Sequence, residues 1–164
     1  MKTNLITRAG WHKLDEELKY LWKVKRPEVT QAVSEAAALG DRSENAEYKY
    51  GKQKLREIDR RLRFLMKRLD AVEIIDHSPQ QDGKVFFGAY VEVENEAGER
   101  ANYRIVGTDE IDVEKRYITI NSPMARALIG KQVDDEIKVM TPKGEQYWIV
   151  NRIQYVPFDA PEAS

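Results

Sequence analysis

The sequence predicts an α+β protein in two parts: an antiparallel α-helical coiled-coil hairpin over residues 1–76 and an antiparallel β-sheet domain with one short helix over residues 85–157. Three observations support this fold class. Apolar residues recur three and four positions apart in the first part, as on one face of a helix. In the second part apolar and polar residues alternate, as in strands with one buried face. Between them, the polar segment 77–84 contains Pro79 and Gly83 and has the composition of a linker.

The first helix is expected from about Ala9 to Leu39. Its apolar face carries Trp11, Leu14, Leu18 and Trp22, and we interpret both tryptophans as packing residues. A proline inside a helix loses one hydrogen bond and clashes with the preceding turn, so we expect a kink at Pro27.

The second helix has a stricter apolar pattern, formed by Tyr48, Gly51, Leu55, Ile58, Leu62, Leu65, Leu69 and Val72. This is the 3.5-residue period of a coiled-coil seam. Two such helices joined by a short turn form an antiparallel hairpin. At about 1.5 Å per residue, the first helix from Leu14 is roughly 40 Å long. We therefore expect the hairpin to project, with an acidic tip at residues 41–47.

The sheet domain is expected to contain strands near residues 90–94, 103–106, 117–120, 137–140 and 147–156. A short helix is expected over 122–130, with Ser122 as N-cap, Pro123 at its first position and Gly130 after its end. We expect residues 158–164 to form a loose tail.

Composition narrows the class of protein. The 164 residues include no cysteine, which excludes disulfides and thiolate zinc sites. No apolar run approaches the roughly 18 residues of a membrane span. We expect a soluble cytoplasmic protein without membrane association. His12 and His77 have no partners at ligand spacing, so neither is expected to bind a metal.

The acidic residues at the predicted turn allow two interpretations. Asp41 and Glu44 have the spacing of a capping box, with Asp41 capping the second helix. Alternatively, they supply an incomplete set of the oxygen ligands that Mg²⁺ prefers, to be completed by a partner. Gly40 permits a tight reversal before them, and Glu47 adds a third acid.

The second helix is strongly basic. Residues 49–68 include nine Lys and Arg, opposed only by Glu57 and Asp59. One interpretation is a solvated helix face. The other is contact with nucleic-acid phosphates, because such faces attract polyanions.

These segments resemble a known family. Gly40–Tyr48, with the sequence Gly-Asp-Arg-Ser-Glu-Asn-Ala-Glu-Tyr, resembles the tip of the bacterial Gre transcript-cleavage factors. Ser78–Gln81, Gly83–Ala89 and Ser122–Leu128 resemble the GreB-type branch. The resemblance extends over residues 2–157.

The resemblance implies a fold and a function. Gre factors have a coiled-coil hairpin and an FKBP-like C-terminal domain that docks on bacterial RNA polymerase. The hairpin enters the secondary channel, and the polymerase's Mg-dependent active site then cleaves backtracked nascent RNA and rescues the arrested complex. By this resemblance the protein is not an enzyme alone, binds no cofactor alone, shares Mg²⁺ with the polymerase and acts as a monomer.

The resemblance also assigns residues. Asp41 and Glu44 are the tip acids that share the Mg²⁺, and Ser43 and Asn45 are their neighbours. The basic stem that guides the RNA 3′ end comprises Lys52, Arg56, Arg60, Arg61 and Arg63. By the resemblance, the polymerase is contacted by Asn121, Ser122 and Pro123. Asn121 stands where an Asp is expected in the GreB-type branch.

Two other functions remain open. The first is a secondary-channel regulator that binds polymerase without promoting cleavage; DksA-type regulators share the hairpin but carry a cysteine zinc site, which is absent here. The second is a prolyl isomerase, suggested only by fold analogy for the C-terminal domain.

Overall fold

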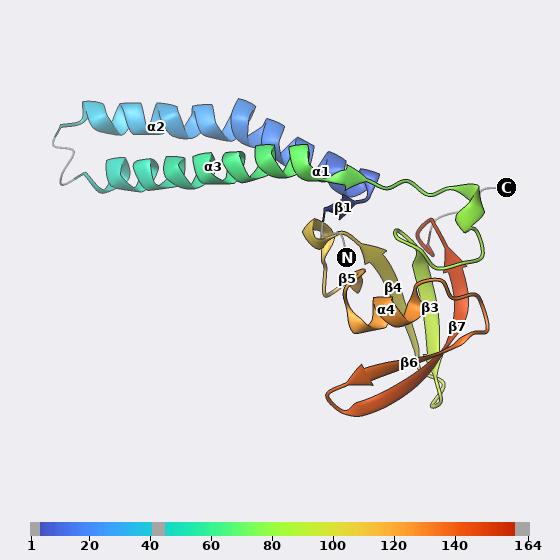
Figure 1. Ribbon diagram of the computed structural model, residues 1–164. Helices are drawn as coiled ribbons and strands as arrows, with labels where there is room; N and C mark the ends of the chain where they lie inside the picture. The colour runs from blue at the N-terminus through green and yellow to red at the C-terminus, as the bar shows by residue number, and fades with distance from the viewer. Residues whose placement is uncertain (1–3, 41–44, 160–164) are drawn as a thin grey trace. The chain divides into compact units, whose positions relative to one another are not determined.

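The computed structural model describes residues 4–40 and 45–159, which form two compact units. One unit is the helical hairpin, residues 11–72, and the other contains the β-sheet, residues 4–10 and 73–159 (Figure 1). The α+β class with a helical hairpin and a sheet domain agrees with the prediction.

The first residues belong to the sheet unit, whereas the sequence placed them with the hairpin. Strand β1 (Leu5–Ile6) pairs in parallel with β2 (Glu73–Ile74). Beside it, the Thr7 N–H donates to Glu110 Oε2 at 3.0 Å, and the Thr7 hydroxyl donates to Glu110 Oε1. These bonds hold the start of the chain on the sheet unit.

The first arm of the hairpin is interrupted near Pro27. It comprises α1 (Arg8–Tyr20), the π-helical segment η1 (Leu21–Lys25) and α2 (Arg26–Ala38). The Arg26 N–H bonds the Leu21 carbonyl, five residues back, and Pro27 lies in the first turn of α2. The irregularity expected at the proline is thus a π-helical turn directly before it.

This turn explains an error in the predicted packing. Trp22 was expected on the buried face, but it is 59% exposed and the Arg26 guanidinium lies 5.7 Å from its ring centroid. A π-helical turn contains more residues than an α-helical one, so it rotates the apolar stripe around the helix. Trp22 consequently faces solvent.

The second arm is one uninterrupted helix, α3 (Ala46–Ala71). Its predicted seam is confirmed at the four positions buried in the structure, Gly51, Ile58, Leu62 and Leu65. Ile58 and Leu62 pack with Val29 of α2. At Gly51 the helices approach so closely that an added Cβ would lie 2.6 Å from Val33 Cγ2. The missing side chain is therefore needed for close packing of α2 on α3.

The sheet unit has five main strands: β3 (Tyr90–Asn95), β4 (Arg100–Val106), β5 (Tyr117–Thr119), β6 (Glu136–Thr141) and β7 (Gly144–Gln154). Their order is β5-β4-β3-β7-β6. All neighbours are antiparallel except β4 and β5, which pair in parallel. The expected fully antiparallel sheet was therefore wrong at this edge, because the chain returns through η3 (Thr108–Glu110) and the following loop before β5 begins.

The short helix α4 (Pro123–Leu128) supplies Ala125 and Leu128 to the sheet core, where they join Val91, Val93 and Val150. The predicted linker, residues 77–84, is fixed to this unit and contains η2 (Pro79–Gln81). The Tyr155 hydroxyl donates to the Lys84 carbonyl at 2.7 Å, and the His77 ring stacks on that of Tyr155. Of the helices described, none has the length and apolarity needed to cross a membrane.

Candidate functional site

The tip of the hairpin lies between α2 and α3. Of the predicted tip residues, Asp41, Ser43 and Glu44 lie outside the described residues. On one side of them, α2 ends at Ala38 and Gly40 has a φ of 126°. This φ is in the region that favours glycine, so the structure agrees with the expected reversal at Gly40.

Asn45, the fourth predicted tip residue, is the N-cap of α3. Its Oδ1 accepts a hydrogen bond from the Tyr48 N–H at 3.0 Å, and its carbonyl accepts from the Lys49 N–H. The interpretation of Asp41 as the cap of this helix was therefore wrong. The helix begins later than the capping-box spacing suggested, and an amide supplies the cap.

The same amide also contacts the other helix. Asn45 Nδ2 donates to the Ala36 carbonyl at 2.7 Å. Ala36 belongs to the last turn of α2, where carbonyls lack the N–H partner four residues on, and its carbonyl also accepts from the Leu39 N–H at 3.2 Å. One side chain thus satisfies a donor at the start of α3 and an acceptor at the end of α2.

Glu47 lies in the first turn of α3 and is exposed. A carboxylate there is stabilised by the positive end of the helix dipole. Within residues 4–40 and 45–159, no three acidic or histidine side chains form a group able to hold a metal. The expected metal-sharing acids, Asp41 and Glu44, are outside those ranges.

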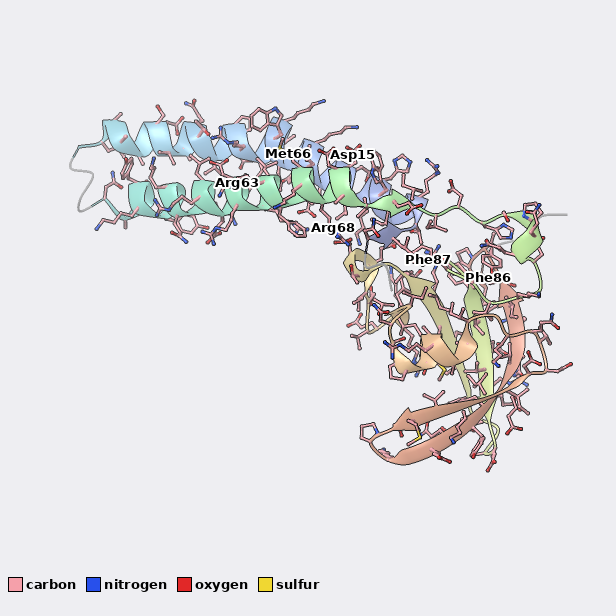
Figure 2. The ribbon with its side chains drawn as sticks, in the orientation of Figure 1. Asp15, Arg63, Met66, Arg68, Phe86 and Phe87 are labelled. Atoms are coloured by element: carbon pink, nitrogen blue, oxygen red, sulfur yellow. The ribbon has the colours of Figure 1, made fainter. Side chains whose placement is uncertain are left out.

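The predicted basic stem lies entirely on α3 and comprises Lys52, Arg56, Arg60, Arg61 and Arg63. Four of its members, all except Arg61, form no ion pair with any described residue. Arg63 is exposed and projects from α3 (Figure 2). Asp59, one of the two acids in this stretch, is paired with Arg26 at 2.8 Å. The positive charge of the stem is therefore left largely uncompensated by its own helix.

Arg61 differs from the other stem residues because it binds the opposite arm. Its Nε lies 2.6 Å from a Glu17 carboxylate oxygen, and its guanidinium lies over the Phe64 ring. This bond and the positive charge of Arg61 lower the pKa of Glu17 below its ordinary range, against the opposing effect of partial burial. Arg61 therefore stabilises the hairpin in addition to contributing charge.

The predicted docking residues form the corner before α4. Ser122 Oγ accepts from the Ala125 N–H at 3.3 Å and donates to the Thr119 carbonyl at 2.8 Å. The expected N-cap is confirmed, and the hydroxyl of Ser122 is occupied by the fold. Pro123 is exposed and Asn121 is half-buried.

An apolar hollow borders this corner. It has a volume of about 430 Å³ and is lined by Tyr103, Ile111, Asp112, Val113, Arg116, Tyr117, Ile118, Thr119 and Ser122. Ile111 is 56% exposed and Val113 is 87% exposed. Ile111 and Val113 thus leave apolar surface uncovered beside the hollow.

Sequence reasoning missed Ile111 and Val113. The signal was present, because both alternate with the acids Glu110, Asp112 and Glu114. By itself this pattern predicts a strand with one buried face. In the structure the segment connects η3 to β5 and leaves both apolar side chains in solvent.

Comparison with known proteins identifies the family. Two family models match: "Transcription elongation factor, N-terminal" over residues 4–74 and "Transcription elongation factor, GreA/GreB, C-term" over residues 80–155. The chain is 68% identical to the transcription elongation factor GreB of Haemophilus ducreyi, covering 94% of this chain and 95% of that protein. It is 66% identical to GreB of Pasteurella multocida, over 94% and 98% respectively.

Among solved structures, the GreA factor homolog 1 protein of Thermus thermophilus is 27% identical, with coverage of 93% of this chain and 99% of that one and a TM-score of 0.42. The family models together span nearly all of the described residues, and the two GreB relatives match over 95% and 98% of their length. The chain belongs to the GreA/GreB family of transcription elongation factors.

Proposed function

We propose that this protein binds bacterial RNA polymerase, inserts its hairpin into the secondary channel and stimulates the polymerase's own cleavage of backtracked nascent RNA. It supplies residues to the polymerase active site and is not an enzyme by itself. The proposal extends family membership, which identifies a transcription elongation factor, to a mechanism.

The observation that carries the mechanism is the N-cap of α3. Asn45 supplies the capping hydrogen bond, so Asp41 is not required for that purpose. In the sequence, Asp41 and Glu44 lie between the two arms of the hairpin. Acidic side chains there are suited to act outside the protein that carries them.

Asp41 and Glu44 would be the ligands for a shared Mg²⁺, which prefers carboxylate and phosphate oxygens. When bound, that ion supplies charge stabilisation at the attacking and leaving oxygens of phosphodiester hydrolysis. The residues of this chain bring carboxylates to the reaction; in the sequence Ser43 lies between the two acids and Asn45 directly follows Glu44. Neither Asp41 nor Glu44 forms a complete site alone.

The other surfaces support the same function. Four stem cations form no ion pair with the described residues and are suited to contact phosphates of the RNA 3′ end: Lys52, Arg56, Arg60 and Arg63. Asn121 and Pro123, with the adjacent apolar hollow, are suited to dock on the polymerase. We propose that the protein acts as a monomer in the cytoplasm.

The test uses a stalled, backtracked elongation complex with end-labelled RNA and Mg²⁺. Addition of the protein is expected to release a short 3′ fragment and to allow elongation to resume. A complex that is not backtracked serves as the control and should release none. Binding to polymerase without cleavage would contradict this mechanism and support the alternative, a secondary-channel regulator without cleavage activity.

A further inference from the structure

We infer that Asn45 is a positioning residue for stimulated cleavage because its side-chain amide closes the hairpin at the base of the tip loop. The inference rests on the proposed function, since it concerns the residues that carry the tip acids. It assigns to the Asn45 donor a role distinct from helix capping.

The geometry separates the two halves of the amide. Oδ1 lies 3.0 Å from the Tyr48 N–H in the first turn of α3, and Nδ2 lies 2.7 Å from the Ala36 carbonyl in the last turn of α2. The reverse orientation of the amide would place a donor against an N–H and an oxygen against a carbonyl. Only the observed orientation satisfies both helices.

The choice of residue follows from this double contact. Asp and Ser cap helices about as well as Asn does, and Thr only slightly less well. Asn is the one strong side-chain cap that also carries an NH₂ donor. Asp at position 45 would place a carboxylate against a carbonyl oxygen, and Ser, whose single hydroxyl oxygen would be used for the cap, has no second atom in place of Nδ2 to reach the Ala36 carbonyl. Capping alone does not require Asn here, whereas linking α3 to α2 does.

The link fixes both ends of the segment that contains the tip acids. The Ala36 carbonyl also accepts from the Leu39 N–H at 3.2 Å, so the end of α2 and the start of α3 meet at one carbonyl. Ala36 is buried and Asn45 is half-buried, which limits competition from water. In the sequence Asp41 follows the Ala36 anchor and Glu44 precedes the Asn45 anchor, so these anchors set where the chain enters and leaves the tip segment.

Catalysis is sensitive to such anchoring, because a displacement of about 1 Å in a reacting group can lower a rate about 100-fold. Asn45→Ser keeps a capping oxygen and removes the Nδ2 amino group, whereas Asn45→Ala removes both. We expect Asn45→Ser to leave helicity and polymerase binding unchanged but to lower the rate of stimulated cleavage on the order of tenfold or more. Asn45→Ala should lower helicity as well.

A distance measurement provides a readout independent of activity. The chain has no cysteine, so nitroxide labels can be attached at Ala38→Cys and Ala46→Cys alone. Both positions are exposed and flank the tip segment. We expect a narrow distance distribution with Asn45 and a broader one with Asn45→Ser, measured by electron paramagnetic resonance.

The outcomes are distinguishable. Slower cleavage together with a broader distribution in Asn45→Ser supports the inference. Cleavage at the unaltered rate in Asn45→Ser overturns it and leaves Asn45 as a cap only, as does slower cleavage with an unchanged distribution. If the unaltered protein stimulates no cleavage, the proposed function fails, and the positioning role fails with it; the distance measurement then still decides whether Asn45 closes the hairpin.

Discussion

The Arg61 guanidinium of α3 donates two hydrogen bonds to the Glu17 carboxylate of α1, from Nε at 2.6 Å and from Nη2 at 2.9 Å. The pair joins the two arms of the hairpin toward the end away from the tip. It therefore distinguishes Arg61 from Arg60 and Arg63, which form no ion pair with the described residues. Arg61 therefore links the two arms of the hairpin, whereas the charges of Arg60 and Arg63 are not used in this way.

The stability of the hairpin should depend on this pair in a pH-dependent way. Arg61 lowers the pKa of Glu17 in the folded state from its ordinary value of 4.5. The pair therefore contributes stability above that value and loses it as the pH falls through the lowered pKa. Because both side chains are partly exposed, Arg61→Gln should reduce the free energy of unfolding by about 0.2–1 kcal/mol near neutral pH, and by less in acid.

Urea denaturation between neutral and acidic pH measures this effect. Arg60→Gln removes the same charge from the adjacent position and should leave the pH dependence unchanged. An equal loss of stability in the two variants would show that the Glu17 pair contributes nothing specific.

Contact with RNA should depend on the unpaired members of the stem. Replacing Arg60 and Arg63 together by Ala should reduce crosslinking of the backtracked RNA 3′ end to α3, while thermal stability stays close to that of the unaltered protein. Each lost phosphate contact should also lower the salt dependence of RNA binding, by about 0.7 in the slope of log affinity against log salt.

The matched control replaces Lys131 and Lys143 by Ala, which removes the same charge from the sheet unit. Unchanged crosslinking and unchanged cleavage of long RNA fragments in the Arg60 and Arg63 variant would mean that the stem is only a solvated face.

Anchoring of the chain start should depend on Glu110. Its carboxylate accepts hydrogen bonds from the Thr7 N–H, the Thr7 hydroxyl and the Gly107 N–H. Thr7 is 4% exposed, so Glu110→Ala would leave donors unsatisfied at a largely buried site. We expect a loss of about 1–3 kcal/mol in the free energy of unfolding and faster amide exchange in β1.

Thermal denaturation and hydrogen exchange by mass spectrometry measure the two effects. Glu114→Ala, at an exposed position in the following loop, is the control for charge and should change neither. Unchanged protection of residues 4–10 in Glu110→Ala would contradict the anchoring role.

Docking should depend on the apolar hollow. Replacing Ile111 and Val113 together by Ser should weaken polymerase binding about tenfold or more, since exposed apolar anchors at interfaces commonly contribute more than 1 kcal/mol. Folding should be little affected, because both side chains are already in solvent. Met140→Ser replaces another exposed apolar side chain, on β6 and away from the hollow, and should leave binding unchanged. Retained binding in the double variant would exclude the hollow from the interface.

The sequence was most informative where one physical signal decided the structure. The long apolar period of α3 predicted Ile58, Leu62 and Leu65 on the seam, and all three are buried. The start of α4 was predicted equally well, because Ser is strongly favoured at the N-cap of a helix and Pro at its first position, as Ser122 and Pro123 are here.

It was least informative where a tertiary contact decided between two local possibilities. Asp41 and Asn45 are both good caps, and the choice between them depends on where α3 meets the Ala36 carbonyl. Likewise β1 has only two residues, which are too few to show an alternating apolar pattern. Its partner β2 follows the whole hairpin in the sequence, so no local signal predicts the pairing. The outward rotation of Trp22 required the π-helical turn, which no residue pattern specified.

The central claim is that the tip acids serve the polymerase active site and not the protein's own fold. Its most direct test compares Asp41→Asn with Asp70→Asn, the same change near the C-terminal end of α3, in the backtracked-complex assay. The account predicts that Asp41→Asn binds polymerase normally but releases no short RNA fragment, while Asp70→Asn cleaves like the unaltered protein. Normal cleavage by Asp41→Asn, or parallel loss of binding and cleavage in that variant, would contradict it.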